Sequence, residues 1–283
     1  MASAAPTVSS KNDRFRPGGD RYRAVFYGRC MFTNPERSSI RSRLIELARA
    51  DSSVVGAALV GSGARYAEDD WSDIDLVLQL APGADEPAVV KVWSESVSEI
   101  GDGTSDTLDV FAGGVRYRVF LLRSSLQIDL SFWPFEQFRA TGGEPFRLLF
   151  GAPGEAGAPD PVDTGEVIGM GWLYAIHARS AVARGRLWQA AGMLEELRSS
   201  LITLKCERIG LNSWHGRGVD QLPAADLDEL HRSHPAQITA AALDTCRRYL
   251  TTRFLEEVER HDPERATRLT DPFRELGRAI VGD

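Results

Sequence analysis

The alternation of hydrophobic and polar positions is most regular between residues 54 and 80, where it predicts a strand, a tight turn, a short helix and a second strand. Residues 54–60 are an apolar run of strand length, and Gly61 ends it. In the second strand, side chains should alternate between the two faces of a sheet. One face is wholly apolar and should be buried: Ile74, Leu76, Leu78 and Leu80. The other face carries Asp73, Asp75, Val77 and Gln79.

A second alternating segment, residues 126–133, brings a third carboxylate into the same kind of setting. Its apolar face consists of Leu126, Ile128, Leu130 and Phe132. Its polar face consists of Gln127, Asp129 and Ser131. A carboxylate inside an apolar strand is costly unless it is paired with a cation or hydrogen-bonded. If the two strands are neighbours in a sheet, Asp129 lies beside Asp73 and Asp75.

Further elements surround these strands within a domain that we expect to span residues 21–150. Their expected bounds are residues 35–50 and 86–100 for two helices, 108–111 and 115–122 for a hairpin, and 146–150 for a short strand or helical turn. Residues 1–20 are rich in Ser, Ala, Pro and Gly, with scattered Arg. We expect them to form a disordered arm.

The composition changes at residues 151–163, where Gly, Ala and Pro predict a linker and a domain boundary. No strand pattern follows, so residues 164–283 are expected to form an all-helical domain. The expected helices are residues 166–184, 187–209, 225–231, 235–260 and 271–280, with a loop at 211–223. The predicted fold class is therefore an α/β domain with a mixed sheet, followed by an all-helical C-terminal domain. A cleft between the two domains would be the default ligand site.

Composition narrows the partners and the location. The 283 residues carry a formal net charge of −7. Proteins that bind nucleic acid usually have a basic surface, so this charge argues against a nucleic-acid partner. The sequence lacks both an apolar run of membrane-spanning length and the apolar core of a signal peptide, so we expect no membrane span. The three cysteines are odd in number and far apart: Cys30, Cys206 and Cys246. This argues against a disulfide framework and predicts that the protein is located in the reducing cytoplasm.

The strand with two carboxylates predicts a metal site. Asp73 and Asp75 would be about 7 Å apart along a strand that rises ~3.3 Å per residue, and like charges at this spacing repel unless a cation lies between them. Hard divalent cations, Mg²⁺ above all, take such oxygen ligands and leave positions for phosphate. The turn at Gly61, Ser62 and Gly63 can bring backbone N–H groups close to an anion. Three carboxylates beside such a turn can hold two metal ions and a triphosphate.

These elements in this order resemble the DNA polymerase β-like nucleotidyltransferase superfamily. Its pattern is an apolar strand, Gly-Ser, then Asp-x-Asp after roughly a dozen residues, and a third Asp on a later strand. The matching positions are Gly61, Ser62, Asp73, Asp75 and Asp129, and the resemblance covers about residues 38–135. The helical part is more loosely similar to the small-molecule branch, which includes aminoglycoside and lincosamide nucleotidyltransferases.

The resemblance implies a transfer of a nucleoside monophosphate from a nucleoside triphosphate, with ATP as the donor, to a hydroxyl group of a small molecule. Antibiotics are among the candidate acceptors. The implied catalytic and metal-binding residues, for two Mg²⁺ ions, are Asp73, Asp75 and Asp129. Gly61 and Ser62 are the implied ligands of the β and γ phosphates.

Several alternatives stay open from the sequence. Arg118, which shares a strand face with Arg116, is predicted to bind triphosphate oxygens, although a solvated face explains it as well. The loop at residues 214–218 is a candidate cover for the nucleotide or the acceptor. The chain can also be a nucleotidyltransferase-like antitoxin or regulator that modifies or binds a partner protein. A degenerate member that binds nucleotide without turnover is the last alternative, and the intact set of three carboxylates argues against it. The acceptor and the oligomeric state cannot be read from the sequence.

Overall fold

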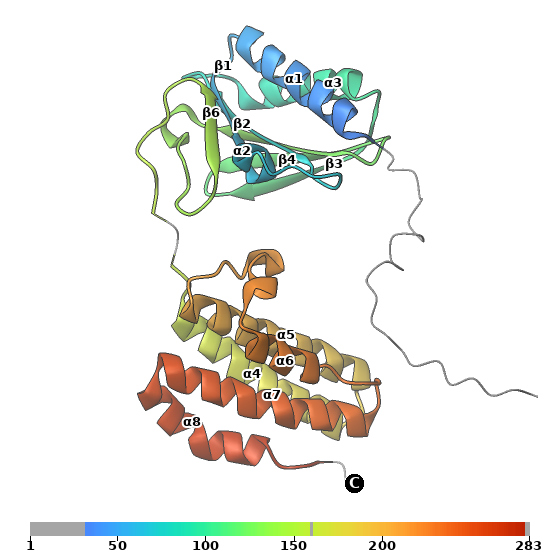
Figure 1. Cartoon of the computed structure of the whole chain (residues 1–283), viewed down its shortest axis with the longest axis vertical. Coiled ribbons are helices and arrows are strands. Elements are labelled where there is room, and N and C mark those ends of the chain that lie inside the picture. The colour runs from blue at the N-terminus through green and yellow to red at the C-terminus, as the bar shows by residue number, and fades with distance from the viewer. Residues whose placement is uncertain (1–31, 159–160, 281–283) are drawn as a thin grey trace, which may run out of the picture. The chain divides into compact units, whose positions relative to one another are not determined.

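The computed structural model of this chain describes residues 32–158 and 161–280. It divides into two compact units, residues 1–160 and 161–283, and Figure 1 labels most of their helices and strands. The division falls inside the segment 151–163, where the composition predicts a linker. The expected disordered arm, residues 1–20, lies outside the described residues, as does Cys30.

A six-stranded sheet forms the centre of the first unit. The strands are β1 (Val54–Val60), β2 (Ile74–Leu80), β3 (Thr104–Ala112), β4 (Val115–Leu122), β5 (Gln127–Trp133) and β6 (Phe146–Phe150). Their order in the sheet is β3-β4-β5-β2-β1-β6. The β2–β5 pair is parallel and the other pairs are antiparallel, which confirms the predicted mixed sheet. β3 begins at Thr104 rather than at residue 108, because pairing with β4 extends it through polar residues that have no apolar pattern.

Two helices cover one face of this sheet (Figure 1): α1 (Asn34–Ala50) and α3 (Glu86–Ile100). The predicted apolar positions of β2 and β5, such as Leu76 and Leu130, pack beneath them around Trp93. α1 begins one residue earlier than predicted, at Asn34, and its N-cap is Thr33. Thr33 accepts a hydrogen bond from the Glu36 backbone, and the Glu36 carboxylate accepts one from the Thr33 backbone. This reciprocal pair satisfies two donors at the start of the helix.

The opposite face of the sheet is covered over only part of its area. A smaller hydrophobic cluster lies there: Ala58, Val77, Val115, Trp133 and Phe138. Phe138 follows the 3₁₀ turn η1 (Phe135–Gln137), in the segment between β5 and β6 that closes this cluster. A short helix, α2 (Gly61–Arg65), follows β1 directly. The polar positions of β2 and β5 lie on this second face, because they alternate with the buried apolar positions.

The described residues of the second unit form helices joined by loops, with no strand, as predicted. Its elements are α4 (Thr164–Ala183), α5 (Leu187–Arg208), η2 (Trp214–Gly216), η3 (Val219–Gln221), α6 (Ala224–Arg232), α7 (Ala240–His261) and α8 (Pro263–Leu276). The sequence predicts the last helix only from residue 271 on, because the segment before it contains few apolar positions. In the structure, Asp262 caps α8 by accepting a hydrogen bond from the Arg265 backbone, and Pro263 fits the first turn. α7 begins later than predicted, at Ala240, where Thr239 is the cap.

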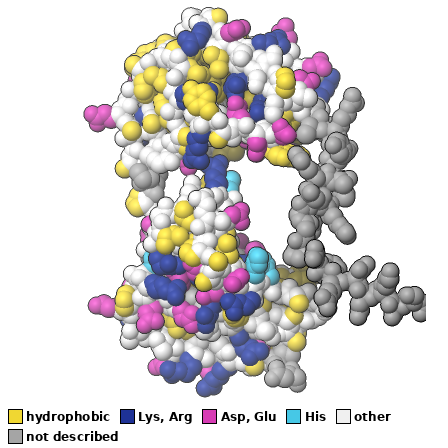
Figure 2. All heavy atoms as spheres, in the orientation of Figure 1, with side chains coloured by type: hydrophobic (Ala, Val, Ile, Leu, Met, Phe, Trp, Pro, Cys, Tyr) yellow, Lys and Arg dark blue, Asp and Glu magenta, His cyan; other side chains and the backbone are white. Residues whose placement is uncertain are grey.

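Charged groups inside the second unit are held in networks. Lys205 is 1% exposed, and its ammonium group donates hydrogen bonds to the carboxylates of Asp226 and Glu229. Acidic and basic side chains are interspersed on the visible face of both units (Figure 2).

None of the described helices is long and apolar enough to cross a membrane.

Candidate metal and nucleotide site

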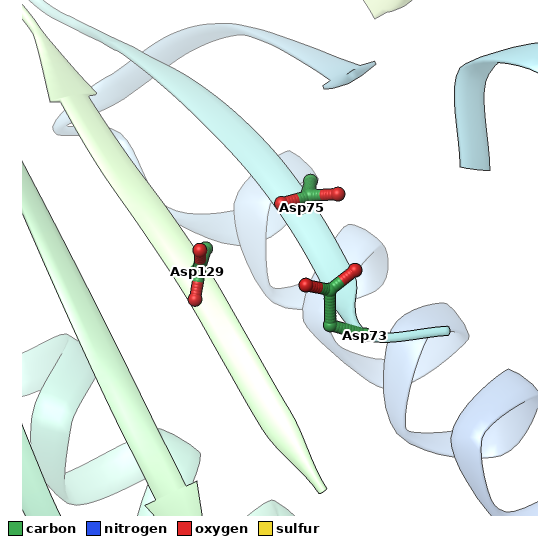
Figure 3. Close-up of side chains that lie close together, drawn as sticks. All are labelled: Asp73, Asp75 and Asp129. Carbon is green, nitrogen blue, oxygen red and sulfur yellow. The ribbon is translucent and has the colours of Figure 1, made fainter. Parts of the chain in front are cut away.

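The sheet register brings the three predicted carboxylates together. Asp75 of β2 pairs with Asp129 of the parallel neighbour β5, and Asp73 lies immediately before β2. One carboxylate oxygen from each residue lies within 4.8 Å of the other two. Figure 3 shows Asp75 and Asp129 on two adjacent strands and Asp73 at the start of one of them, with the three carboxylates close together. The neighbouring-strand arrangement expected from the two alternating segments is therefore present.

The electrostatics of this cluster are unfavourable without a cation. All three residues are partly buried. Burial raises the pKa of Asp129, and the nearby negative charge of Asp73 raises it further, whereas a hydrogen bond from Gln127 opposes the rise. That bond runs from Gln127 Nε2 to Asp129 Oδ1 over 3.0 Å. Three carboxylate oxygens at this separation are a ligand set for a hard divalent cation, which would offset both the burial and the mutual repulsion.

The turn after β1 is shaped around one of these carboxylates. Gly61 has φ +59°, and a Cβ at this position would overlap Oδ2 of Asp75. Only glycine therefore fits the backbone here without moving the carboxylate. The next residue, Ser62, has a buried hydroxyl oxygen with no hydrogen-bond partner among the residues that the structure describes. A buried hydroxyl without a partner is costly, so a ligand with acceptor oxygens suits this position.

The loop that carries Asp73 is held by a buried cation. Arg37 of α1 is 2% exposed and donates hydrogen bonds to the backbone carbonyls of Asp69 and Ser72, at 2.5 and 3.1 Å. The Asp69 carboxylate accepts hydrogen bonds from the Trp71 backbone and from the Ser72 hydroxyl. These contacts fix the chain that leads into Asp73. Neither Arg37 nor Gln127 was predicted from the sequence as a site residue. Gln127 shares the polar strand face with Asp129, which is a usable signal, whereas an arginine on a helix gives none.

Arg118, predicted as a nucleotide ligand, is not in this site. It pairs with Leu130 across β4 and β5, so its side chain lies on the helix-covered face, opposite to Asp129. There its guanidinium group donates to both oxygens of Asp109, each at 2.6 Å, and to the Ser94 hydroxyl at 2.8 Å. Arg116, on the same face, bonds Asp109 and Glu86. The two arginines join β3, β4 and α3, and the prediction for Arg118 is corrected accordingly.

The loop predicted as a cover belongs to the second unit. Trp214 is exposed, and its ring stacks on His215 with centroids 4.6 Å apart. His215 has a left-handed backbone with φ 51°, and it lies within η2. The loop is therefore structured by these contacts. That it covers the nucleotide or the acceptor stays a prediction.

Comparison with known proteins adds little to this geometry. No family model matches the chain, and no curated protein matches it. One similar solved structure is an aminoglycoside 6-adenyltransferase from Bacillus subtilis. It is 12% identical, the match covers 85% of this chain and 98% of that one, and the TM-score is 0.34. At this TM-score the likeness assigns neither a fold family nor an activity to this chain.

Proposed function

We propose that this protein is a metal-dependent nucleotidyltransferase. It would transfer a nucleoside monophosphate, AMP from ATP, to a hydroxyl group of a small molecule and release pyrophosphate. The observation that carries the proposal is one cluster: three carboxylate oxygens within 4.8 Å of one another, beside a turn whose buried Ser62 hydroxyl lacks a partner among the described residues. A magnesium–triphosphate group would supply a cation to the carboxylates and an acceptor oxygen to the Ser62 hydroxyl.

The residues suit two Mg²⁺ ions. Carboxylate oxygens are the donors that Mg²⁺ prefers, and the ion keeps further positions for phosphate oxygens and water. Asp73 and Asp75 would hold both ions, and Asp129 would hold the ion on the acceptor side. When bound, the ions supply positive charge opposite the phosphates and lower the pKa of the acceptor hydroxyl.

The chain's own groups would then position the reactants. Gly61 lets the backbone approach the β and γ phosphates, and the Ser62 hydroxyl donates a hydrogen bond to one of their oxygens. The acceptor oxygen forms a bond to the α phosphorus while the bond to the bridging oxygen breaks, and pyrophosphate leaves with the electron pair. The acceptor proton would pass to the carboxylate of Asp129. Gln127 holds that carboxylate in place through its hydrogen bond to Oδ1.

A regulator that modifies a partner protein would use the same chemistry on a different acceptor. The two functions therefore differ in what receives the nucleotide, and an acceptor screen separates them. The cytoplasm as location and ATP as donor also stay predictions.

The test has two stages. Calorimetric titration of the full chain with a non-hydrolysable ATP analogue, with and without Mg²⁺, measures binding without any acceptor. Transfer of label from the α phosphate of ATP to aminoglycosides, other hydroxylated metabolites and partner proteins then identifies the acceptor. We expect the ATP analogue to bind only with Mg²⁺ present. Asp75→Asn should remove this binding, and Asp70→Asn should retain it. Asp70 is the control because its exposed carboxylate lies near the same loop but outside the cluster. If the wild-type protein binds no nucleotide with Mg²⁺ present, the proposal is wrong.

A further inference from the structure

The sheet face that carries the carboxylates continues beyond Asp129 as an exposed aliphatic strip. Val119 of β4 pairs with Asp129, and Leu108 of β3 pairs with Val119, so the three form one row across the strands. In the rows on either side, Val110 pairs with Tyr117 and Leu121 pairs with Gln127. Paired residues point to the same face of a sheet. We call Leu108, Val110, Val119 and Leu121 the aliphatic strip.

Three of the four side chains in the strip are exposed, and Val119 is partly buried. Leu108 is 60% exposed, and Val110 and Leu121 are each 46% exposed. β3 is an edge strand, so its side chains have neighbours on one side only. Neighbouring exposed apolar side chains of this kind are a candidate binding surface. Across the same sheet face, the corresponding apolar positions near β1 and β2 are covered by Phe138 and its neighbours.

The position of the strip relates it to the proposed chemistry. Neighbouring strands are about 4.8 Å apart, so Val119 lies about one strand spacing from Asp129 and Leu108 about two. A molecule of a few rings spans that distance. If its hydroxyl group is at Asp129, its body extends over Val119 toward Leu108.

We infer that the aliphatic strip binds an apolar ring or chain of the acceptor, so that the acceptor class is an amphiphilic hydroxylated molecule rather than a polycationic sugar. The inference rests on the proposed function, because it places the reacting hydroxyl at Asp129. The strip itself contains no charged side chain; Asp129 pairs with Val119 at its inner side, and Asp106 pairs with Leu121 at its outer end. A strongly hydrated polycation would leave the strip exposed, whereas an apolar surface would cover it.

This assignment predicts a dependence on hydrophobic length. Each methylene group that the strip removes from water should strengthen binding by about threefold to fourfold. The dependence should end when the ligand's alkyl chain passes Leu108, because Leu108 lies on the edge strand of the sheet.

The experiment uses the full chain with Mg²⁺ and a non-hydrolysable ATP analogue bound. Methyl, butyl and octyl β-D-glucosides, kept below their micellar concentrations, are the probes because they share one hydroxylated head and differ in apolar length. Methyl-group NMR reports where they bind. We expect the signals of Leu108, Val110 and Leu121 to shift, with affinity rising from methyl to octyl. The double variant Leu108→Ser with Val110→Ser should bind octyl glucoside about tenfold or more weakly.

Phe111→Ser is the matched control. Phe111 lies on the same edge strand and is 63% exposed, but it faces the other side of the sheet, where it packs on Arg116. This variant should bind the octyl probe as the wild-type protein does, and the nucleotide affinity of all variants should be unchanged.

Four results would overturn the inference. The probes can leave the strip signals unmoved, or the Phe111 variant can lose as much affinity as the double variant. The strip signals can already show contacts with residues 1–31 in the free protein, which makes that segment the occupant. They can also change with protein concentration, which makes a second copy the occupant. In each case, metal-dependent nucleotide binding by the wild-type protein shows that only this inference, and not the proposed function, has failed.

Discussion

Asp75 and Asp129 occupy paired positions of two parallel strands, although α3, β3 and β4 separate them in the sequence. A parallel pair needs such a long connection, and here the connection itself supplies the aliphatic strip. The pairing also fixes the identity of the facing residues. Because neighbouring side chains in a strand point to opposite faces, a shift by one residue would replace Asp129 with Ile128 or Leu130.

The first prediction separates the roles of these two carboxylates. Asp75→Asn should remove metal-dependent nucleotide binding and transfer together. Asp129→Asn should keep nucleotide binding within about threefold and lose most of the chemical step, the pattern of an interaction made mainly in the transition state. Nucleotide Kd by titration and single-turnover rate, measured on both variants, check this. Equal losses of nucleotide affinity would show that the two carboxylates share one role.

A second prediction concerns Gly61. Gly61→Ala should lower stability and metal affinity together, because the left-handed backbone costs roughly 1–2 kcal/mol for a residue with a Cβ and the new Cβ displaces the Asp75 carboxylate. Gly83→Ala is the control, since Gly83 also has a positive φ, +76°, but has nothing within 4 Å of the added Cβ. Urea unfolding and Mg²⁺ titration of both variants give the comparison. If Gly83→Ala reduces metal affinity equally, the contact with Asp75 is not the cause.

Ser62 should contribute to binding and not to folding. Its buried hydroxyl has no partner among the described residues, so Ser62→Ala should leave the unfolding free energy unchanged or slightly higher. The same variant should weaken nucleotide binding by roughly 1.5–3 kcal/mol, the value of a hydrogen bond to a charged group. Titration with the ATP analogue and thermal unfolding measure the two effects. Ser96→Ala, on the exposed face of α3, is a control that should leave nucleotide affinity unaltered. A stability loss without an affinity loss would make Ser62 a structural residue.

Arg37 should act as a positioning residue for Asp73. Arg37→Ala removes two hydrogen bonds to backbone carbonyls and leaves a space in a buried site, so we expect a loss of roughly 2–4 kcal/mol in unfolding free energy. Amide hydrogen exchange in residues 69–73 should accelerate, and Mg²⁺ affinity should fall in the folded variant. Arg43→Ala, which removes an exposed arginine from the same helix, is the comparison. Unchanged exchange in the loop would contradict the role.

The last prediction uses Asp109, on the helix-covered face. The hydrogen bond from Arg118 holds the pKa of Asp109 below its ordinary value of 3.8. A depressed carboxylate pKa adds stability that is fully present above about pH 4 and is lost as the pH falls through the lower folded-state value. Asp109→Asn should therefore reduce stability at neutral pH and flatten its decline below pH 4. Urea unfolding between pH 2 and 7 tests this. Nucleotide affinity should not change in this variant, and a large loss would return Arg118 to the nucleotide site.

Alternation predicted the central strands because each has one face in the core. The same rule placed Asp73, Asp75 and Asp129 on polar faces, and the structure brings them together. Alternation also puts Arg116 and Arg118 on the same face of the sheet, but it does not say whether this is the carboxylate face or the helix-covered face. That choice depends on the register with β5, a long-range property, and the sequence reading of Arg118 failed for this reason.

Three further features of the structure could not be predicted from local sequence patterns. Arg37 contacts carbonyls more than 30 residues away in the sequence, and nothing in its own helix distinguishes it from a surface arginine. The first half of α8 was missed because its capping residue and proline, rather than apolar periodicity, mark its start. The openness of Leu108 and Val110 follows from β3 being an edge strand, which only the sheet order reveals.

The pairing of β2 with β5 also has a consequence for how the chain folds. The β3–β4 hairpin can form locally, but the three carboxylates meet only when the long connection has closed. Bringing them together concentrates negative charge at the centre of the nascent sheet, and a bound cation would relieve this repulsion. If Mg²⁺ binds only the completed pair, an ion concentration one hundred times its Kd would stabilise the native state by about 2.7 kcal/mol. The supply of the ion would then govern the survival of the folded protein as well as its turnover.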